Sequence, residues 1–438
     1  MNFRQEAYST ILKVLKDGEF SDTLLQQRAK KLKSSGEDIG LFYTLVKGVI
    51  KQRLKLDYIL SKFTDEKKFA STDLKIKVIL YSALYQLLYL GSIPEHAAVN
   101  ESVELAKSLF NPQVADFVNA VLRNYLRSPE IEYPSEPHLR IAYEHSFPPD
   151  LIEKWIGYWG EEDTEYLALY FNENPELHLR VNTTATSADK LQQYFAKRNI
   201  VLTASQASKQ MFHSTQASEI LEDVAFSEGY FSVQDTSAAL VVELLDPKKE
   251  ESILDLFAAP GGKCTYIAEL LDNTGEVIAV DKIPNKMKLL KQAADRLQLS
   301  NISLVTTDAF KYGPVAPAYD RVLVDAPCSG WGVFSRKADL RWQAHNNISD
   351  LIKIQEKALD YAANFVKLEG CMVYSTCTMN PQENDEQVAA FLSRNKRFEL
   401  VDASQFIPKQ YTDNGLMKTV PFKHHMDGAF AARMKRVR

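Results

Sequence analysis

The second half of the chain alternates short apolar segments with amphipathic ones, and this alternation restricts the possible folds more than any other feature. Helical patterns over residues 263–271, 284–297 and 348–368 separate apolar segments of strand length. Strands joined through helices form parallel crossover units, so residues 241–438 are predicted to form a doubly wound α/β sheet. Five strands are expected, with the sequences ESILDLFAA, EVIAVD, ISLVTTD, RVLVDAP and GCMVYSTCT.

Polar side chains stand where these expected strands end. Asp281, Asp308 and Asp325 close the second, third and fourth strands, and Cys377 lies near the end of the fifth. In an open α/β sheet the ligand binds at the carboxyl ends of the strands, so these residues are expected to converge on one crevice. The position of Asp281 suits ribose hydroxyls and that of Asp308 an adenine amino group. N-capping of a helix is the alternative explanation for either residue.

The first expected strand runs into a glycine-rich corner with the sequence Asp255-Leu-Phe-Ala-Ala-Pro-Gly-Gly-Lys263. Two adjacent glycines let a ligand approach the backbone closely, and the helix that begins there presents its free N–H groups. The corner matches neither the GxGxxG pattern of dinucleotide-binding proteins nor a Walker loop. A tight turn without a ligand is the alternative interpretation.

Three segments precede the expected sheet. Residues 1–128 repeat apolar residues at three- and four-residue spacing, and the run LKIKVILYSALYQLLYL is apolar on nearly every face. This pattern predicts an all-α helical bundle with a buried central helix. Residues 129–176 are rich in proline and acid and are expected to be a connector with short helices. Residues 177–240 combine the strand-like HLRVNTT with a helical pattern, which predicts a small α/β module.

The net charge of −5 is distributed unevenly along the chain. Residues 1–128 carry a net charge of +5, residues 129–176 carry −10, and the remainder is neutral. A negative total argues against a nucleic-acid partner, because phosphate neutralisation needs Lys and Arg. However, the acidic excess lies wholly in the connector. Two basic clusters in the bundle either form a solvated helix face or contact phosphate, and the sequence leaves both open: Arg28, Lys30, Lys31 and Lys33, then Lys47, Lys51, Arg53 and Lys55.

The four cysteines are too few for a disulfide framework and fit a reducing, cytoplasmic setting. Cys264 and Cys371 fall in a predicted helix and a predicted strand, where a buried cysteine acts as a small apolar residue. Cys328 and Cys377 instead lie among small polar residues at strand ends. A thiolate in such a cleft is a candidate nucleophile.

Metal and membrane binding are not expected. The chain has no CxxC, and its histidines show no ligand spacing except the adjacent pair His424-His425. The longest nearly uncharged apolar stretch, residues 78–90, is too short to span a bilayer. The first residues lack the apolar region of a signal peptide.

Motifs in the last 200 residues resemble those of the S-adenosylmethionine-dependent RNA 5-methylcytosine methyltransferases. The matching blocks are AAPGGK, DAPCSG, and YSTCT followed by NPQEN. The segments SIPEHAAVNESVELAK and FVNAVLRNYLR resemble the NusB-type RNA-binding fold. The two together are similar to the bacterial RsmB/Sun (Fmu) branch, which modifies small-subunit ribosomal RNA. The resemblance implies a Rossmann-like methyltransferase domain after a NusB-like domain.

The resemblance also implies a role for each residue of the expected crevice. Cys377 would be the nucleophile that adds to C6 of cytosine, Cys328 would assist release, and Asp325 would lie between cofactor and base. Asp281 would hold the ribose and Asp308 the adenine of S-adenosylmethionine. The corner residues Phe257, Ala258, Ala259, Pro260, Gly261, Gly262 and Lys263 would embrace its methionine and ribose portions.

Three positions depart from the family pattern. Phe257 stands where Cys is common, Cys264 where Thr is common, and Ala429 replaces an aromatic residue of the closing strand. Phe257 and Cys264 do not carry the thiol chemistry, so small packing changes and intact activity are expected. The segment FSRKADLRW corresponds to a basic stretch of the family, which makes three residues candidates for RNA phosphate contact: Arg336, Lys337 and Arg341.

The resulting hypothesis is a monomeric enzyme that forms 5-methylcytosine in 16S rRNA, either free or in a partly assembled small subunit. Two alternatives remain open. A tRNA cytosine-C5 methyltransferase would share the catalytic motifs but would not need the N-terminal bundle. A non-catalytic RNA-binding assembly factor would not need the intact cysteine pair or the three aspartates.

Overall fold

The computed structural model describes residues 3–33, 38–313, 318–343 and 347–438, and these residues form two compact units. The first unit comprises residues 1–173 together with 336–343. The second comprises residues 174–335 and 344–438. The chain therefore leaves the second unit after Ser335, contributes one short segment to the first unit, and returns.

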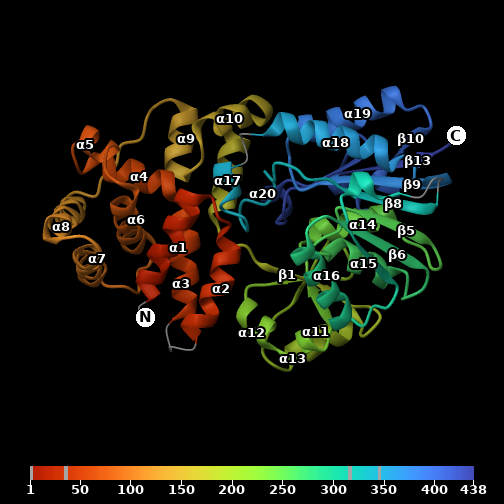
Figure 1. The fold of residues 1–438 in the computed structure, drawn as a ribbon, viewed down its shortest axis with the longest axis horizontal. Helices are drawn as coiled ribbons and strands as arrows, with labels where there is room; N and C mark the ends of the chain where they lie inside the picture. Colours follow the sequence, from red (N-terminus) through yellow and green to blue (C-terminus); the bar gives the residue numbers. More distant parts are fainter. Residues whose placement is uncertain (1–2, 34–37, 314–317, 344–346) are drawn as a thin grey trace. The chain divides into compact units, whose positions relative to one another are not determined.

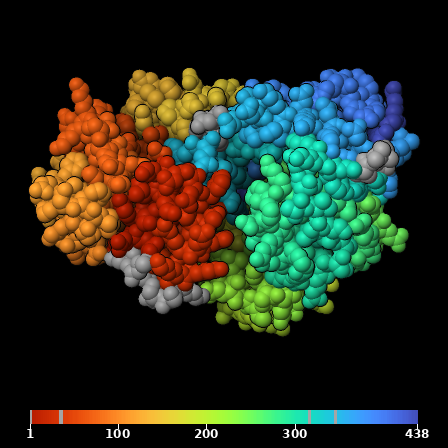
Figure 2. Space-filling view, viewed as in Figure 1, coloured from red at the N-terminus to blue at the C-terminus, as the bar shows by residue number. Residues whose placement is uncertain are grey.

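The elements of the first unit that the structure describes are all helices (Figure 1). Its core gathers residues from eight consecutive helices among the described residues, and the coloured atoms of residues 3–33 and 38–127 lie together in the space-filling view (Figure 2). Helix α6 is buried on nearly every turn, as its uniformly apolar sequence predicts. The predicted bundle is confirmed, with the helices α1 (Phe3–Asp17), α2 (Ser21–Lys33), α3 (Ile39–Lys51), α4 (Arg53–Lys62), α5 (Glu66–Ala70), α6 (Leu74–Tyr89), α7 (Glu95–Leu109) and α8 (Pro112–Arg127).

The acidic segment after the bundle folds as two helices of the first unit, α9 (Pro137–His145) and α10 (Pro149–Asn172). Proline occupies the first turn of each, where its missing N–H costs nothing. Helix α10 breaks at Gly160, whose φ of 81° is a left-handed value that favours glycine. The break separates the two short helices that the sequence predicts here.

The second unit begins with a small antiparallel sheet in the strand order β2-β3-β1-β4. Its strands are β1 (Leu177–Val181), β2 (Thr203–Ala204), β3 (Met211–Ser214) and β4 (Phe231–Val233). Helices α11 (Ala188–Ala196), α12 (Ala217–Glu222) and α13 (Val224–Ser227) contribute Leu191, Phe195 and Ile220 to a separate core.

In the described part of the chain the large sheet has nine strands, in the order β11-β12-β13-β9-β8-β5-β6-β7 with β10 paired to β13. Strands β9, β8, β5, β6 and β7 are parallel, and β13 is antiparallel to β9. The five predicted strands are all present. The strand bounds are β5 (Ser252–Leu256), β6 (Glu276–Asp281), β7 (Ile302–Thr306), β8 (Tyr319–Asp325), β9 (Val366–Thr376), β10 (Phe398–Val401), β11 (Thr412–Asp413), β12 (Leu416–Lys418) and β13 (Phe430–Arg436).

Helices cover both faces of this sheet, which makes it doubly wound as predicted (Figure 1). One core packs α14 (Thr236–Leu245), α15 (Gly262–Leu270) and α16 (Pro284–Arg296) against alternate strand residues such as Ile253 and Leu323. The other packs α18 (Ile348–Ala362) and α19 (Asp385–Arg394) against Leu254 and Val322. The period of two along each strand sends successive side chains to opposite cores.

The end of helix α18 was predicted wrongly. The predicted helix ran to residue 368, whereas α18 ends at Ala362 and Val366 begins β9. Val366 pairs with Tyr319 of β8, so sheet pairing overrides the helical periodicity there. Among the described residues, no helix is long and apolar enough to cross a membrane.

Candidate active site

The glycine-rich corner connects β5 to α15 at the carboxyl edge of the sheet. Gly261 has a φ of 109°, and a Cβ there would lie 2.2 Å from Leu290 Cδ1 of α16. Only glycine therefore lets α15 start this close to α16. Phe257 is also left-handed, with a φ of 64°, and its ring packs edge-on against Phe310 at 6.1 Å. The predicted turn between strand and helix is present at this corner.

Two of the predicted aspartates hold backbone around this corner. Asp281 accepts hydrogen bonds from the N–H of Ala259 at 3.3 Å and of Ile283 at 2.9 Å, so it ties the corner to the end of β6. Asp308 caps the short helix η1 (Ala309–Lys311) by accepting from the N–H of Phe310 at 3.0 Å. Both carboxylates thus accept hydrogen bonds from backbone N–H groups, as a helix-capping residue does. Each bonded carboxylate oxygen has a second lone pair, so it can still accept a hydrogen bond from a ligand.

Asp325, at the end of β8, is paired with Lys263. Lys263 Nζ donates to Asp325 Oδ2 at 2.7 Å, and Ser375 Oγ donates to Asp325 Oδ1 at 2.8 Å. Burial alone would lower the pKa of Lys263, but the charge and hydrogen bond of Asp325 outweigh it and raise the pKa. Lys263 therefore carries a positive charge beside Asp325, and the nearby Cys377 strengthens this preference.

The structure brings Cys328 and Cys377 together from the ends of β8 and β9. Their sulfur atoms are 3.2 Å apart, although 49 residues separate them in sequence. The hydrogen bond with Cys377, followed by burial, raises the pKa of the Cys328 thiol well above its usual range. Cys328 therefore keeps its proton, and its thiol lies within hydrogen-bonding distance of the Cys377 sulfur.

Glu383 links the loops that carry the two cysteines, and its role was not predicted. Its buried carboxylate accepts from Ser329 N at 2.8 Å and from Gln355 Nε2 and Asn380 Nδ2 at 3.0 Å each. Ser329 Oγ donates to the same carboxylate and lies 2.8 Å from Thr378 Oγ1. Ser329 follows Cys328 and Thr378 follows Cys377, so Glu383 fixes the position of both thiols. The NPQEN motif contains Glu383, but the sequence alone does not indicate its partners.

Asp255 is a second residue without a predicted role. Its carboxyl group is 1% exposed and neither oxygen has a hydrogen-bond partner among the described residues. Burial, then the charge of Asp325, raises its pKa well above the usual range. The raised pKa favours the neutral carboxylic acid, so Asp255 adds no negative charge to the end of β5 that leads into the glycine-rich corner.

The structure contradicts the prediction that Arg341 contacts RNA phosphate. Arg341 lies in α17 (Leu340–Gln343) within the first unit and is 0% exposed. Its Nη1 donates at 3.1 Å to the carbonyls of Lys51 and Ser146 and to Asn172 Oδ1, and its guanidinium lies over the Phe147 ring. The sequence pattern could not distinguish this internal use of an arginine from a surface one.

The neighbouring residues of this segment also contact the helical unit. Asp339 accepts from Ser21 N at 2.7 Å and from Ser21 Oγ at 2.6 Å, at the start of α2. Lys337 is exposed and pairs with Asp22, and Arg336 is partly exposed. Phosphate contact at Arg336 and Lys337 stays a prediction.

Several residues of the predicted basic clusters are paired within the first unit. Arg28 donates to Glu6 Oε2 at 3.1 Å, and Lys47 Nζ lies 3.1 Å from Asp22 Oδ1. Burial and the charge of Arg341 lower the pKa of Lys51 to about 7. These contacts reduce the positive charge that the first unit can offer to phosphate.

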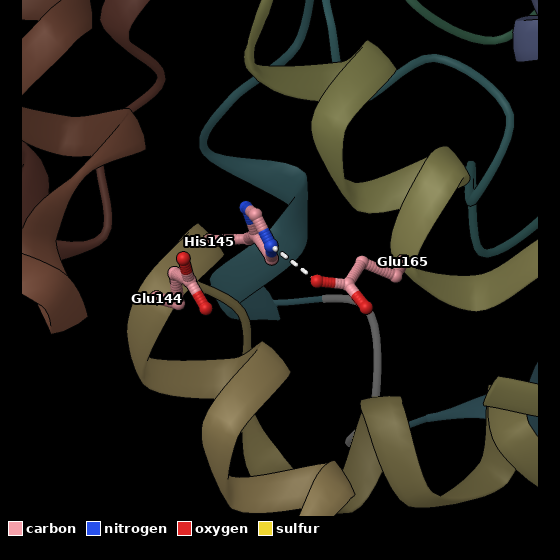
Figure 3. Close-up of side chains that lie close together, drawn as sticks. All are labelled: Glu144, His145 and Glu165. Carbon is pink, nitrogen blue, oxygen red and sulfur yellow. Dashed lines mark ion pairs between the residues drawn. The ribbon is translucent and has the colours of Figure 1, made fainter. Parts of the chain in front are cut away.

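One group of potential metal ligands occurs among the described residues: Glu144, His145 and Glu165, on α9 and α10 (Figure 3). Arg140 also belongs to it, because its Nη1 and Nη2 each donate to a Glu165 oxygen at 2.7 Å. The hydrogen bond from Arg140 lowers the pKa of Glu165. A guanidinium already neutralises the acids, so the group acts as an ion-pair link between α9 and α10.

Comparisons with known proteins agree with this architecture. A family model described as 16S rRNA methyltransferase RsmB/F matches residues 242–435, and the NusB family model matches residues 1–127. A third model, described as an RsmF/B-like ferredoxin-like domain, matches residues 147–220. The last of these begins inside the segment predicted as a connector.

Full-length relatives give the same assignment. Proteins of Synechocystis and Bacillus subtilis, both named "Probable ribosomal RNA small subunit methyltransferase B", are each 34% identical to this chain and cover 99% of it. The matches cover 99% and 98% of those proteins, respectively. The crystal structure of PH0851 shares the fold, with a TM-score of 0.82 at 23% identity over 98% of both chains. The chain therefore belongs to the RsmB/F family of 16S rRNA methyltransferases.

Proposed function

We propose that this protein transfers the methyl group of S-adenosylmethionine to C5 of a cytosine in 16S rRNA, with Cys377 as the covalent nucleophile. The observation that carries the proposal is the pair of sulfurs 3.2 Å apart, next to the Lys263–Asp325 pair. Both cysteines are free thiols. Two neighbouring thiols suit a site in which one is the nucleophile and the other assists it.

The corner fits the proposed cofactor by the chemistry of its donors and acceptors. Asp281 offers carboxylate oxygens at the end of β6, where ribose hydroxyls bind in related sheets, and Asp308 offers them at the end of β7. The segment from Phe257 to Lys263 provides an exposed helix N-terminus. When bound, the cofactor supplies an electrophilic methyl group on a sulfonium centre.

The protein residues prepare cytosine for this transfer. Cytosine C5 is a poor nucleophile until the Cys377 thiolate adds to C6, which breaks the C5=C6 double bond and moves its electrons toward N3. Asp325 accepts a hydrogen bond from Lys263 Nζ, so a proton that passes from Lys263 to Asp325 can be donated to N3. The resulting enamine carbon forms the new C–C bond as the methyl–sulfur bond breaks.

Release of Cys377 needs a base for the C5 proton. Removing that proton reforms the C5=C6 double bond and expels Cys377 as a thiolate. The hydrogen bond with Cys377 is the main cause that keeps Cys328 protonated in the free enzyme. This cause disappears once Cys377 has become a thioether, so Cys328 can then lose its proton to water, and the resulting thiolate takes the C5 proton, directly or through a water molecule.

The test is methyl transfer from labelled S-adenosylmethionine to unmodified 16S rRNA. Cys377→Ala should abolish transfer, whereas Cys328→Ala should accumulate a covalent protein–RNA adduct that migrates slowly in a denaturing gel. Cys371→Ala, which removes a buried thiol outside the pair, is the matched control and should keep activity. Full activity of Cys377→Ala would refute the mechanism, and methylation of purified tRNA in preference to 16S rRNA would refute the substrate.

A further inference from the structure

The side chain of Gln234, between β4 and α14, is locked in one orientation. It is 6% exposed, and its Oε1 accepts a hydrogen bond from Arg180 Nη1. Arginine has only donors, so the amide oxygen must face Arg180 and the amide NH₂ must point away from it. This assignment needs no choice between the two possible amide orientations.

Arg180 is itself held rigidly. It is 0% exposed and donates to both oxygens of Glu269, from Nε at 3.0 Å and from Nη2 at 2.7 Å. Its Nη1 also donates to the carbonyl of Gly262 at 3.0 Å, and the guanidinium lies over the Tyr266 ring. Arg180 comes from the small sheet, whereas its partners lie on α15. It therefore fixes Gln234 relative to the start of that helix.

The NH₂ group of Gln234 lacks an acceptor at the glycine-rich corner. Nε2 is buried and has no hydrogen-bond partner among the described residues. A Cβ placed on Gly262, the first residue of α15, would lie 3.5 Å from this atom. The N-cap residue of α15 is Gly261, and the described residues show no side-chain capping hydrogen bond there. A buried amide donor without an acceptor is costly, so this donor beside a helix N-terminus points to a ligand acceptor.

We propose that Gln234 Nε2 donates a hydrogen bond to the carboxylate of the methionine part of S-adenosylmethionine, and that Arg180 is the positioning residue for this amide. The inference rests on the proposed function, since it assigns one end of the same cofactor. A carboxylate suits the place because the N–H groups and the dipole of α15 favour negative charge there. The acceptors Asp281 and Asp308 suit the hydroxyl and amino groups at the other end of the molecule.

The test uses ligands that differ at this end, with affinities measured by calorimetry on the full-length protein. S-Adenosylhomocysteine carries the carboxylate. Decarboxylated S-adenosylmethionine keeps the amine alone, and 5′-methylthioadenosine lacks both groups. Gln234→Glu keeps the acceptor for Arg180 and replaces the donor by an oxygen, so folding should be preserved. It should weaken S-adenosylhomocysteine about 10- to 100-fold, the range expected for a hydrogen bond to a charged group, and change the other two ligands less than threefold.

Two further variants keep the inference falsifiable. Gln234→Leu should show the same selective loss, and Gln193→Leu, an exposed glutamine on α11, should bind all three ligands like the wild type. Equal weakening of all three ligands by Gln234→Glu would overturn the inference, because it would show a general effect on the corner. Unchanged binding of S-adenosylhomocysteine would also overturn it. If the wild-type protein bound none of the adenosyl ligands, the proposed function itself would fail.

Discussion

Replacing Glu383 by Gln tests whether the buried carboxylate positions the two cysteines. One oxygen accepts from Ser329 N and Gln355 Nε2, and the other from Ser329 Oγ and Asn380 Nδ2. Glutamine turns one of these acceptors into a donor that faces two donors. The less costly choice places the new NH₂ opposite Ser329 Oγ, whose hydroxyl can turn to Thr378 Oγ1.

The structure sets the size of the effect. One hydrogen bond to a charged acceptor is lost, and each contributes about 1.5–3 kcal/mol. The Asn380 amide then loses one acceptor in a buried place, so the total destabilisation of the second unit should be about 2–4 kcal/mol. Because Ser329 and Thr378 adjoin the cysteines, the sulfurs should also shift, and a displacement near 1 Å costs about 100-fold in rate.

Two assays separate these effects. Urea unfolding followed by near-UV circular dichroism gives the loss of stability, and single-turnover methyl transfer to 16S rRNA at saturating cofactor gives the rate. Glu386→Gln, an exposed change three residues away, is the matched control and should alter neither. A Glu383→Gln protein that loses less than about 0.5 kcal/mol, the usual limit for surface substitutions, and keeps a rate within threefold of wild type would refute the reasoning.

Three further predictions concern buried charges and thiols. Arg341→Met should destabilise the first unit by about 3 kcal/mol or more in urea unfolding, because it leaves buried carbonyls without a donor, whereas Lys337→Met should cost at most about 1 kcal/mol. Equal effects would contradict the internal role of Arg341. Lys51→Met should stabilise the first unit most below pH 7, because the pKa of Lys51 is lowered to about 7 and the folded protein must hold its charge there. This gain should shrink as pH rises toward the ordinary lysine pKa near 10.4, and a gain that grows with pH would contradict it. In Cys377→Ala, loss of the thiol hydrogen bond should lower the pKa of Cys328. Iodoacetamide should therefore alkylate Cys328 faster at pH 8.5 in this variant than in Cys377→Ser, which keeps a hydrogen-bonding group. Equal alkylation rates in the two variants would argue against the hydrogen bond between the thiols.

The parts of the fold that were predictable are those with strong local patterns. Strand–helix alternation predicted β5 to β9, and the uniformly apolar run predicted the central helix α6. The short strands β10, β11 and β12 have no comparable signal, because two to four residues cannot show a period. The end of α18 was misplaced since Val366 fits either element until its partner Tyr319 is known.

The residues of the candidate active site were likewise predictable where the local sequence pattern was strong. Polar residues at strand ends predicted that Asp281, Asp308, Asp325 and Cys377 converge, because parallel strands share one carboxyl edge. The structure places Cys328 beside Cys377 at the ends of β8 and β9. The partners of Glu383 come from three separate segments, and nothing in the local sequence joins them. Arg341 was predicted to contact phosphate because arginine is common at phosphate sites, but its side chain is buried inside the helical unit. Hydrogen bonds between residues far apart in the chain could therefore not be predicted from the sequence pattern.

The central claim is that Cys377 acts as the nucleophile that makes 5-methylcytosine in 16S rRNA. Bisulfite sequencing of 16S rRNA from cells that carry either the wild-type gene or Cys377→Ala tests it most directly, because 5-methylcytosine resists conversion. The account predicts a cytosine that is protected with the wild-type gene and fully converted with the variant. The same protected cytosines in both strains, with equal amounts of protein, would contradict the claim.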